Sequence, residues 1–320
     1  MLSFHQIVAS DFSAVNKMIV DELHSDVGLV ENIGNYIVEG GGKRLRPLTV
    51  LLAAKACGYK GEDHISLATI VEFIHTATLL HDDVVDRSDR RRGRDTANAL
   101  WGDSPTILVG DFLYSRAFQL MVKLNNMGIM KIMADTTNVI AEGEVQQLVN
   151  IGNLAIDEGV YEATIFKKTA VLFQAAAQSG AVIASAPDNH SDALAQYGYH
   201  LGMAFQLQDD VLDYGGDADQ MGKNLGDDLA EGKMTLPLIY AMAQGSEAAQ
   251  EIIATAFQKA DTSLMGDILN ILSDAKSLEY CYEKASHHAC SAKESLRDLP
   301  ATDYRQTMEN IADFSVKRSF

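Results

Sequence analysis

The sequence contains few cysteines and no long apolar run, and each shortage excludes a class of protein. Cys57, Cys281 and Cys290 are the three cysteines in 320 residues. They have no metal-ligand spacing and are too few for a disulfide framework, which is typical of a reducing compartment. No uninterrupted apolar run approaches the ~20 residues that cross a bilayer, and the first residues lack the basic start of a signal peptide. We therefore expect a soluble, cytoplasmic protein.

Positive charge is also scarce. The chain has 26 Lys and Arg against 44 Asp and Glu, a formal net charge of −18. Nucleic-acid binding usually needs a basic face, so this balance argues against nucleic acid as a general partner. Hydrophobic residues make up 47% of the chain, which is ample for a large core. Nothing marks a domain boundary, and we expect one domain over residues 1–320.

Proline is rare, and the long segments between the five prolines carry apolar residues at three- and four-residue spacing, the helical period. Runs that alternate with a period of two are scarce, and no hairpin is expected. The pattern predicts an all-α fold, a single large helical bundle. The clearest helices are expected at residues 67–86, 104–124, 129–150, 160–185 and 191–214. Ser104 is expected to cap the second of these, with Pro105 at its first helical position.

Two clusters of aspartate share one spacing. They are DDVVD at residues 82–86 and DDVLD at residues 209–213, and each ends an apolar helix. The aspartates stand at i, i+1 and i+4, so the first and the last share a helical face. Acidic groups near a helix C-terminus oppose the macrodipole and repel one another, and a divalent cation would remove both penalties. Carboxylate oxygens suit Mg²⁺, which also bridges to phosphates.

The acidic residues are compatible with two other interpretations. A single DDxxD would be interpreted as a solvated helix end, but two copies in matching contexts, each beside basic loop residues, favour metal binding. Glu72 and His75 form one Glu-x-x-His motif. Di-iron carboxylate bundles carry two such motifs, and no second one is present. A di-iron site is therefore rejected.

The basic residues gather in loops near the acidic clusters. Arg91 and Arg92 follow the first cluster, and Lys43, Arg44 and Arg46 lie in GGKRLRP. The planar fork of arginine matches phosphate oxygens two at a time, and glycine lets the backbone approach a ligand closely. Further lysines are Lys168, Lys223 and Lys233. Each alone fits a surface charge, but together with two metal-binding clusters they predict a site for two polyphosphates.

These motifs resemble those of the trans-polyprenyl diphosphate synthases, most of all the bacterial octaprenyl type, which makes a quinone side chain. They occur in the family's order over nearly the whole chain, as GGKRLRP, FIHTATLLHDDVVD, RRG, KKTAVLF, AFQLQDDVLDY and GKNLGDDLAEGKMTLP. The resemblance implies an all-α bundle around a deep central cavity, a homodimer, and Mg²⁺ as cofactor. It also implies isopentenyl diphosphate and an allylic diphosphate primer as substrates, and transient membrane contact for product release.

The resemblance assigns roles residue by residue. The ligands for Mg²⁺ on the allylic diphosphate are Asp82, Asp83, Asp86, Asp209, Asp210 and Asp213. The site for isopentenyl diphosphate is formed by Lys43, Arg46, His75 and Arg92. The allylic side is formed by Arg91, Lys168, Thr169, Gln206, Lys223 and Lys233, several of them close to the developing cation. Lys317 and Arg318 match the basic tail that caps the site in relatives. A lone histidine on an apolar helix is usually a core residue, but the place of His75 two turns before the aspartates favours a ligand.

The length of the product is expected to depend on residues along the tail cavity. Ala77 and Thr78 lie one to two turns before the first aspartate cluster, where short-chain relatives have aromatic rings. Small side chains there leave the cavity open. Met121 and Met133 are the next candidate stops for a growing tail. Both methionines fit ordinary core filling equally well, and the sequence leaves the two interpretations open.

Two rival functions share some of these features. A terpene cyclase or a head-to-head synthase uses similar metal chemistry, but class I cyclases usually carry an Asn/Ser/Glu-type second motif, and neither rival needs GGKRLRP. A non-catalytic regulatory subunit of a synthase would typically lose aspartates, whereas this chain has both sets.

Overall fold

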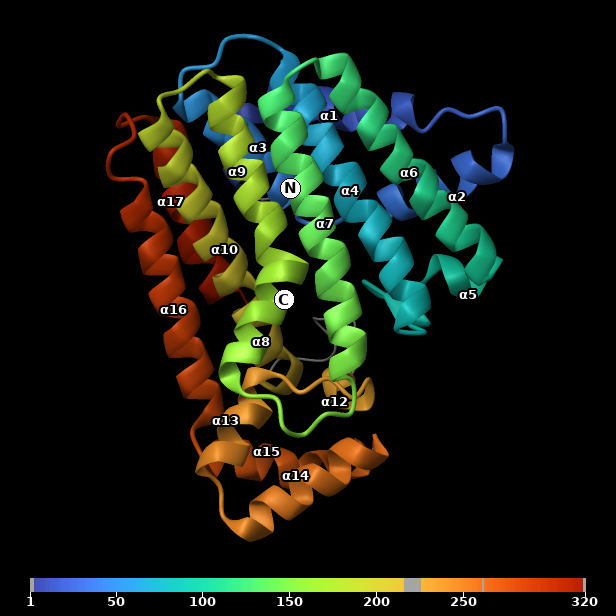
Figure 1. The fold of residues 1–320 in the computed structure, drawn as a ribbon, viewed down its shortest axis with the longest axis vertical. Coiled ribbons are helices and arrows are strands. Elements are labelled where there is room, and N and C mark those ends of the chain that lie inside the picture. Colours follow the sequence, from blue (N-terminus) through green and yellow to red (C-terminus); the bar gives the residue numbers. More distant parts are fainter. Residues whose placement is uncertain (1–2, 216–225, 261, 319–320) are drawn as a thin grey trace. The chain divides into compact units, whose positions relative to one another are not determined.

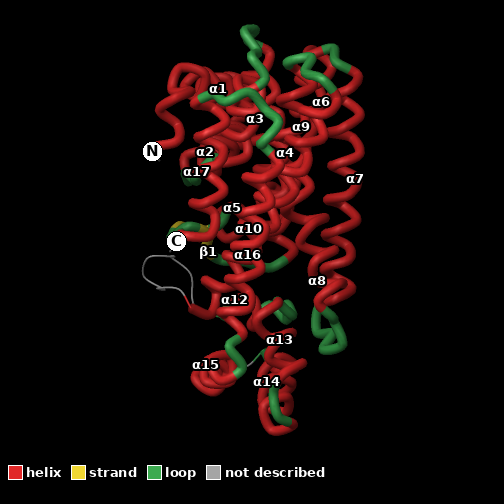
Figure 2. Tube along the Cα trace, turned by 90° about the vertical axis from the view of Figure 1, so that its left-hand side faces the viewer, coloured by secondary structure: helices red, strands yellow, loops and turns green. Residues whose placement is uncertain are grey.

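The computed structural model describes residues 3–215, 226–260 and 262–318 of the chain. Figure 2 shows that helices make up nearly all of it. Within those ranges the only strands are β1 (Arg90–Arg91) and β2 (Arg94–Asp95). The predicted all-α class is confirmed. None of the helices in the same ranges is long and apolar enough to span a bilayer.

The chain divides into two compact units, each built from three segments. The first unit comprises Met1–Thr137, Leu172–Gly198 and Lys293–Ile311. Its own elements are η1 (Ser3–Val8), α1 (Ala9–Glu22), α2 (Gly28–Glu39), α3 (Leu45–Ala56), α4 (Asp63–Val85), β1, β2, α5 (Ala97–Trp101) and α6 (Asp103–Leu124). Helices with residues in both units are α7 (Met127–Asn150), α9 (Val171–Ile183), α10 (Asp188–Gly215), α16 (Ser277–Ser295) and α17 (Asp303–Lys317).

Helix α4 forms the centre of the first unit, where it packs against α1, α3 and α6 (Figure 1). Most of its middle is apolar and buried, and Leu67, Ile70, Phe73 and Ile74 are fully buried. Burial of each such side chain contributes about 1.5–3 kcal/mol. This packing fixes the C-terminal end of α4, where the first aspartate cluster stands.

The second unit comprises Asn138–Val171, Tyr199–Ala292 and Ala312–Phe320. Its own elements are α8 (Glu158–Ile165), η2 (Phe166–Ala170), α12 (Asp227–Ala230), α13 (Leu236–Gln244), α14 (Glu247–Lys259), η3 (Thr262–Leu264) and α15 (Met265–Asp274). Helices α13, α14 and α15 pack on one another (orange in Figure 1). A buried apolar cluster that includes Met203, Leu207 and Leu236 joins α10 to α13. This core fixes the part of α10 that carries the second aspartate cluster.

The expectation that no hairpin occurs was wrong. Strands β1 and β2 pair antiparallel around Arg92 and Gly93, whose φ angles are 52° and 75°. Two consecutive positive φ angles make the type I′ turn that two-residue hairpins favour. The flanking residues are arginines, so the alternation of apolar and polar residues that signals a hairpin is missing. The turn nevertheless fixes the backbone of the arginine-rich loop.

Most predicted helices are present, with ends shifted by a few residues. The predicted cap at Ser104 is wrong, because α6 begins at Asp103 and its N-cap is Gly102, with a φ of 85°. Gly102 also ends α5, so one glycine turns the chain between the two helices. The predicted helix over residues 160–185 is interrupted by η2, which is a π-helical turn.

Candidate active site

The π-helical turn η2 carries two predicted site residues, Lys168 and Thr169. A π turn closes i→i+5 hydrogen bonds, is rare, and occurs mostly at functional sites. Its extra residue moves Lys168 and Thr169 away from the positions that a regular α-helix would give them. The turn therefore marks a part of the second unit where chemistry is expected.

Two glycines bring neighbouring helices against η2. An added Cβ at Gly202 of α10 would lie 2.4 Å from the Cα of Ala170. An added Cβ at Gly143 of α7 would lie 2.7 Å from the Cβ of Lys167. Neither position has room for a methyl group, so the backbones of α7 and α10 meet η2 directly. This contact places the next turn of α10 opposite Thr169.

A chain of side-chain hydrogen bonds joins η2, α10 and α8. The hydroxyl of Thr169 donates to Oε1 of Gln206 at 2.9 Å, and Nε2 of Gln206 donates to Oδ1 of Asp210 at 2.8 Å. The hydroxyl of Tyr161 donates to Oδ2 of Asp210 at 2.5 Å. Burial raises the pKa of Asp210 and that of Tyr161 well above their usual values. Together, these hydrogen bonds hold the amide of Gln206 in one orientation.

These side chains line a pocket of about 140 Å³ in the second unit. Its wall also includes Lys168, Lys233 and Asp228. Lys168 pairs with Glu144 at 2.9 Å, and Lys233 pairs with Glu231 at 2.6 Å. Five predicted site residues line the pocket, namely Lys168, Thr169, Gln206, Asp210 and Lys233, while Lys223 lies outside the described residues. The pocket thus holds both acidic and basic side chains, as a site for a metal-bound diphosphate requires.

The other two aspartates of the second cluster have different partners. Asp209 accepts a hydrogen bond from Nη2 of Arg318 at 2.5 Å. The same guanidinium donates to the carbonyl of Phe205 at 2.8 Å and stacks over its ring. Asp213 accepts a longer hydrogen bond, 3.3 Å, from the backbone N–H of Asp228. Arg318 of the predicted basic tail therefore contacts the second cluster directly.

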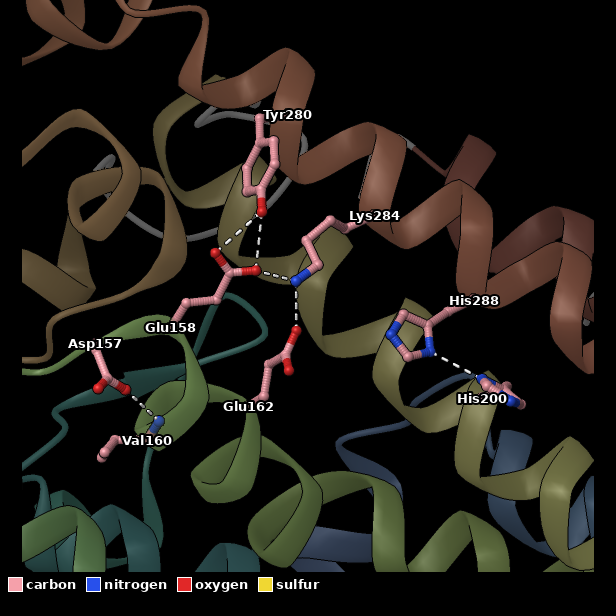
Figure 3. Close-up of polar contacts among 8 residues, drawn as sticks. All are labelled: Asp157, Glu158, Val160, Glu162, His200, Tyr280, Lys284 and His288. Carbon is pink, nitrogen blue, oxygen red and sulfur yellow. Dashed lines mark hydrogen bonds and ion pairs between the residues drawn. The ribbon is translucent and has the colours of Figure 1, made fainter. Parts of the chain in front are cut away.

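Helix α8 is held against α16 by a network of ion pairs and hydrogen bonds (Figure 3). Lys284 contacts both Glu158 and Glu162, the second at 2.5 Å. The hydroxyl of Tyr280 donates to Oε1 of Glu158 at 2.9 Å. The two glutamates lie on either side of Tyr161 in the sequence. The network therefore fixes the helix from which the Tyr161 hydroxyl reaches Asp210.

In the first unit, the loop before α3 meets the arginine hairpin. The guanidinium of Arg92 donates to the carbonyl of Gly41. Nη1 of Arg46 lies 3.2 Å from Nε2 of His75, and the charges of Arg46 and Arg92 both act on that imidazole. Three of the four residues predicted for isopentenyl diphosphate thus lie in one cluster. Lys43, the fourth, stands in the loop between Gly41 and α3.

Burial and neighbouring charges set the protonation of this cluster. Desolvation, together with Arg46 and Arg92, lowers the pKa of His75 well below its usual value. Because Arg46 can only donate, Nε2 of His75 accepts and Nδ1 carries the proton. Glu72 lies 3.8 Å from Arg44, and burial raises the pKa of its carboxyl. The sequence singled out Glu72 only in the rejected di-iron motif, whereas its place among arginines makes it a counter-charge for the basic loop.

The first aspartate cluster ends α4, as predicted. Asp83 is fully buried, and its Oδ1 accepts from Nε of Arg91 at 2.7 Å. Its Oδ2 is buried without a hydrogen-bond partner. A buried carboxylate oxygen that lacks a donor fits a ligand for a hard cation such as Mg²⁺. Asp82 and Asp86 are partly exposed. In the part of the chain that the structure describes, no three His, Cys or acidic side chains have the geometry of a metal site.

Comparison with known proteins identifies the family. The family model "Polyprenyl synthetase" matches residues 27–274. The chain belongs to the polyprenyl synthetase family. This polyprenyl synthetase is 48% identical over 311 residues to the octaprenyl diphosphate synthase of Haemophilus influenzae, over 97% of this chain and 94% of that one. The predicted family is confirmed, and the chain is a prenyltransferase.

Two solved structures show the same fold as this polyprenyl synthetase. A decaprenyl diphosphate synthase from Rhodobacter capsulatus has a TM-score of 0.94 at 43% identity, over 99% of this chain and 98% of that one. A polyprenyl synthase from Caulobacter crescentus, complexed with calcium and isoprenyl diphosphate, has a TM-score of 0.94 at 42% identity, over 99% and 97% of the two chains. The relatives' names thus include products of different length.

The residues predicted to set product length in this polyprenyl synthetase all lie in its first unit. Ala77 of α4, Met121 of α6 and Met133 of α7 are buried. Thr78 is partly buried, and its hydroxyl donates to the carbonyl of His75 at 2.8 Å. Core filling and a closed tail cavity both require burial, so the role in chain length stays a prediction.

Two residues of the pocket region were not predicted from the sequence. Tyr161 lies four residues before Ile165, at a spacing that is typical of a core-facing stripe. Glu144 lies in a polar segment that is typical of a solvated helix face. Their roles depend on the π turn and on the close approach of Gly202, which bring distant segments together. No local signal in the sequence distinguishes either residue.

Proposed function

We propose that this polyprenyl synthetase is a long-chain all-trans polyprenyl diphosphate synthase that makes octaprenyl diphosphate, the side-chain precursor of a quinone such as ubiquinone. The observation that carries the proposal is the pocket in which Lys168, Thr169, Gln206 and Asp210 come together. The name of the Haemophilus relative supports the octaprenyl product. The reaction joins an allylic diphosphate to successive isopentenyl diphosphates.

Six aspartates hold Mg²⁺ on the allylic diphosphate in this proposal. They are Asp82, Asp83, Asp86, Asp209, Asp210 and Asp213. The buried Oδ2 of Asp83, which lacks a donor, supports the assignment. When bound, Mg²⁺ shields the diphosphate, which is a poor leaving group while its charge is uncompensated. Calcium in the Caulobacter structure supports a divalent cation in this family.

Basic side chains bind the allylic diphosphate directly and stabilise its charge as it departs. Arg91 and Lys168 supply this charge, with Lys233 and Lys223. The carbon that loses the diphosphate becomes a resonance-stabilised cation. The hydroxyl of Thr169 and the carbonyl oxygen of Gln206 present negative dipole ends to it without forming a bond. The released diphosphate then takes the proton lost after condensation.

Isopentenyl diphosphate binds through Lys43, Arg46 and Arg92, whose positive charges match its phosphates. His75 adds a neutral hydrogen-bond donor, since desolvation and nearby arginines lower its pKa. The low pKa supports this role, because a neutral imidazole avoids repulsion among the cations. The double bond of this substrate attacks the allylic cation. Repeated cycles lengthen the tail along a cavity that Ala77 and Thr78 leave open, until Met121 and Met133 stop it.

The proposal extends to assembly and location. The chain acts as one domain over residues 1–320 and forms a homodimer in the cytoplasm, with transient membrane contact when the apolar product leaves. Exposed apolar side chains of the first unit support a partner surface, since Leu108, Val122 and Met127 are 65%, 67% and 75% exposed. Analytical ultracentrifugation of the purified chain tests the dimer, and a monomer at working concentration would contradict it.

Product analysis tests the function. The purified chain is incubated with Mg²⁺, labelled isopentenyl diphosphate and an allylic primer, and the product is identified by mass. Octaprenyl diphosphate is expected. A cyclic hydrocarbon or a head-to-head product would contradict the synthase assignment. Product that forms only after a second chain is added would indicate a regulatory subunit, and a different tail length would correct the octaprenyl assignment.

A further inference from the structure

Tyr161 lies at the buried end of the hydrogen-bonded chain in the second unit. Its side chain is 4% exposed, and its hydroxyl donates to Oδ2 of Asp210 at 2.5 Å. A tyrosine hydroxyl has one proton to donate, and here that proton is directed at the aspartate. The bond connects α8 to α10. Tyr161 therefore contacts a residue of the second aspartate cluster without belonging to either motif.

The other two hydrogen bonds of this series, from Gln206 and from Thr169, depend on Asp210. Its Oδ1 accepts from Nε2 of Gln206, and Oε1 of Gln206 accepts from the hydroxyl of Thr169. An amide side chain has one donor end and one acceptor end, which exchange when its plane rotates by half a turn. Both oxygens of Asp210 accept hydrogen bonds, Oδ2 from Tyr161 and Oδ1 from Gln206. Gln206 must therefore turn its NH₂ group to Asp210 and its oxygen toward Thr169.

We propose that Tyr161 is a positioning residue for prenyl transfer, which through Asp210 keeps the carbonyl oxygen of Gln206 and the hydroxyl of Thr169 directed at the carbon that loses diphosphate. The inference rests on the proposed function, since these two dipoles matter only where an allylic cation forms. All four residues line the same pocket. Without the tyrosine hydroxyl, one oxygen of Asp210 loses its donor and the carboxylate can rotate. The amide of Gln206 can then turn its positive NH₂ end to the cation.

Tyr197 provides a matched control. It is fully buried in the first unit, and its hydroxyl donates to the backbone carbonyl of Met308 at 2.9 Å. Tyr197→Phe removes one hydroxyl and one buried hydrogen bond, as Tyr161→Phe does, but leaves the pocket intact. Both variants should lower the unfolding temperature by a similar small amount, because each leaves one buried acceptor without its donor. Only Tyr161→Phe should change the chemical step.

Steady-state kinetics at saturating Mg²⁺ test the proposal. Tyr161→Phe should lower kcat about ten- to a hundredfold, the usual cost of losing a residue that orients a catalytic group. The KM for isopentenyl diphosphate should stay within about twofold of wild type, because binding is not disturbed. Tyr197→Phe should retain wild-type kcat.

A double-mutant cycle shows whether Tyr161 acts through Gln206. Adding Tyr161→Phe to Gln206→Ala should lower kcat no further than Gln206→Ala alone, because Tyr161 acts through the same series of hydrogen bonds as Gln206. The proposal would be overturned if the double variant lost kcat by the product of the two single-variant losses. Wild-type kcat in Tyr161→Phe would also overturn it, as would a Tyr161→Phe protein that fails to fold while Tyr197→Phe folds. Failure of the proposed function is a separate result, since wild type itself would then show no prenyl transfer.

Discussion

Gly202 of α10 lies against Ala170 of η2 so closely that an added Cβ would stand 2.4 Å from the Cα of Ala170. Gly202→Ala must push α10 and η2 apart. We expect the free energy of unfolding to fall by about 1–3 kcal/mol, the usual cost of overpacking. We also expect a lower kcat, because the 2.9 Å hydrogen bond between Thr169 and Gln206 spans the same interface. Chemical denaturation and steady-state kinetics measure the two effects.

The control is a glycine of the same unit with open space around it. Gly266 of α15 has no atom within 4 Å of an added Cβ. Gly266→Ala should be neutral or should stabilise by up to about 1 kcal/mol, because alanine is the better helix former. Equal stability of the two variants would contradict the close packing at Gly202.

Asp82→Ala should remove most of the rate while the fold stays intact. Asp82 is partly exposed at the end of α4, so its loss affects the metal and not the core. Asp83→Ala should differ, because Asp83 is fully buried and holds Arg91 at 2.7 Å. Its loss leaves the partly buried guanidinium of Arg91 without its partner, so the unfolding temperature should fall further than in Asp82→Ala. Turnover at saturating Mg²⁺ and the unfolding temperature separate the two variants. Unchanged turnover in Asp82→Ala would reject a metal-binding role.

Product length should respond to residues on α4 and α6. Ala77→Phe should shorten the product, because an aromatic ring blocks the start of the tail cavity, and Met121→Ala should lengthen it. Both side chains are buried. In a solid core, Ala77→Phe would cost about 1–3 kcal/mol, and Met121→Ala about 2–5 kcal/mol. Mass analysis of the products and thermal unfolding should be done together. Identical product lengths in all three proteins would reject the cavity hypothesis.

Stability should fall in mild acid because of a histidine pair in the second unit (Figure 3). Nδ1 of His200 lies 2.9 Å from Nδ1 of His288. Burial, with His200, His287 and Lys284 nearby, lowers the pKa of His288 to about 4. The unfolded chain therefore binds more protons than the folded protein between about pH 6.5 and the lowered pKa, and the free energy of unfolding decreases as the pH falls through this window.

Unfolding temperatures measured across this pH window test the pair. His288→Asn should make the decline with acid shallower, since one of the two depressed groups is gone. His287→Asn should leave most of the decline, because His287 is exposed on the same helix. The interpretation would be wrong if all three proteins lost stability in parallel.

The helices and the positions of the aspartates follow from local sequence. The 3.6-residue period decides where α4 and α10 run, and each acidic cluster stands near the end of its helix. Local periodicity was enough for these features. The motifs also singled out Lys168 and Gln206, but their meeting in one pocket depends on the π turn and on the close approach of Gly202.

Other features depend on contacts between distant segments and could not be predicted. The letters KKTA look like part of an ordinary helix, so the sequence does not reveal the π turn. The turn occurs where Gly143 and Gly202 let α7 and α10 approach it closely. The hairpin at Arg92 lacks apolar alternation. The bond from Tyr161 to Asp210 joins residues that are far apart in the sequence. Tertiary packing, and not local secondary-structure propensity, determines all three of these features.

The residues predicted to set product length and the hydrogen bonds that orient Gln206 belong to different units. Ala77 and Met121 belong to the first unit, whereas the hydrogen bonds between Tyr161 and Thr169 belong wholly to the second. If Ala77 and Met121 set the product length, as we predict, substitutions that change the tail leave the hydrogen bonds of the second unit intact. Directed evolution of tail length can then begin from a few positions of the first unit.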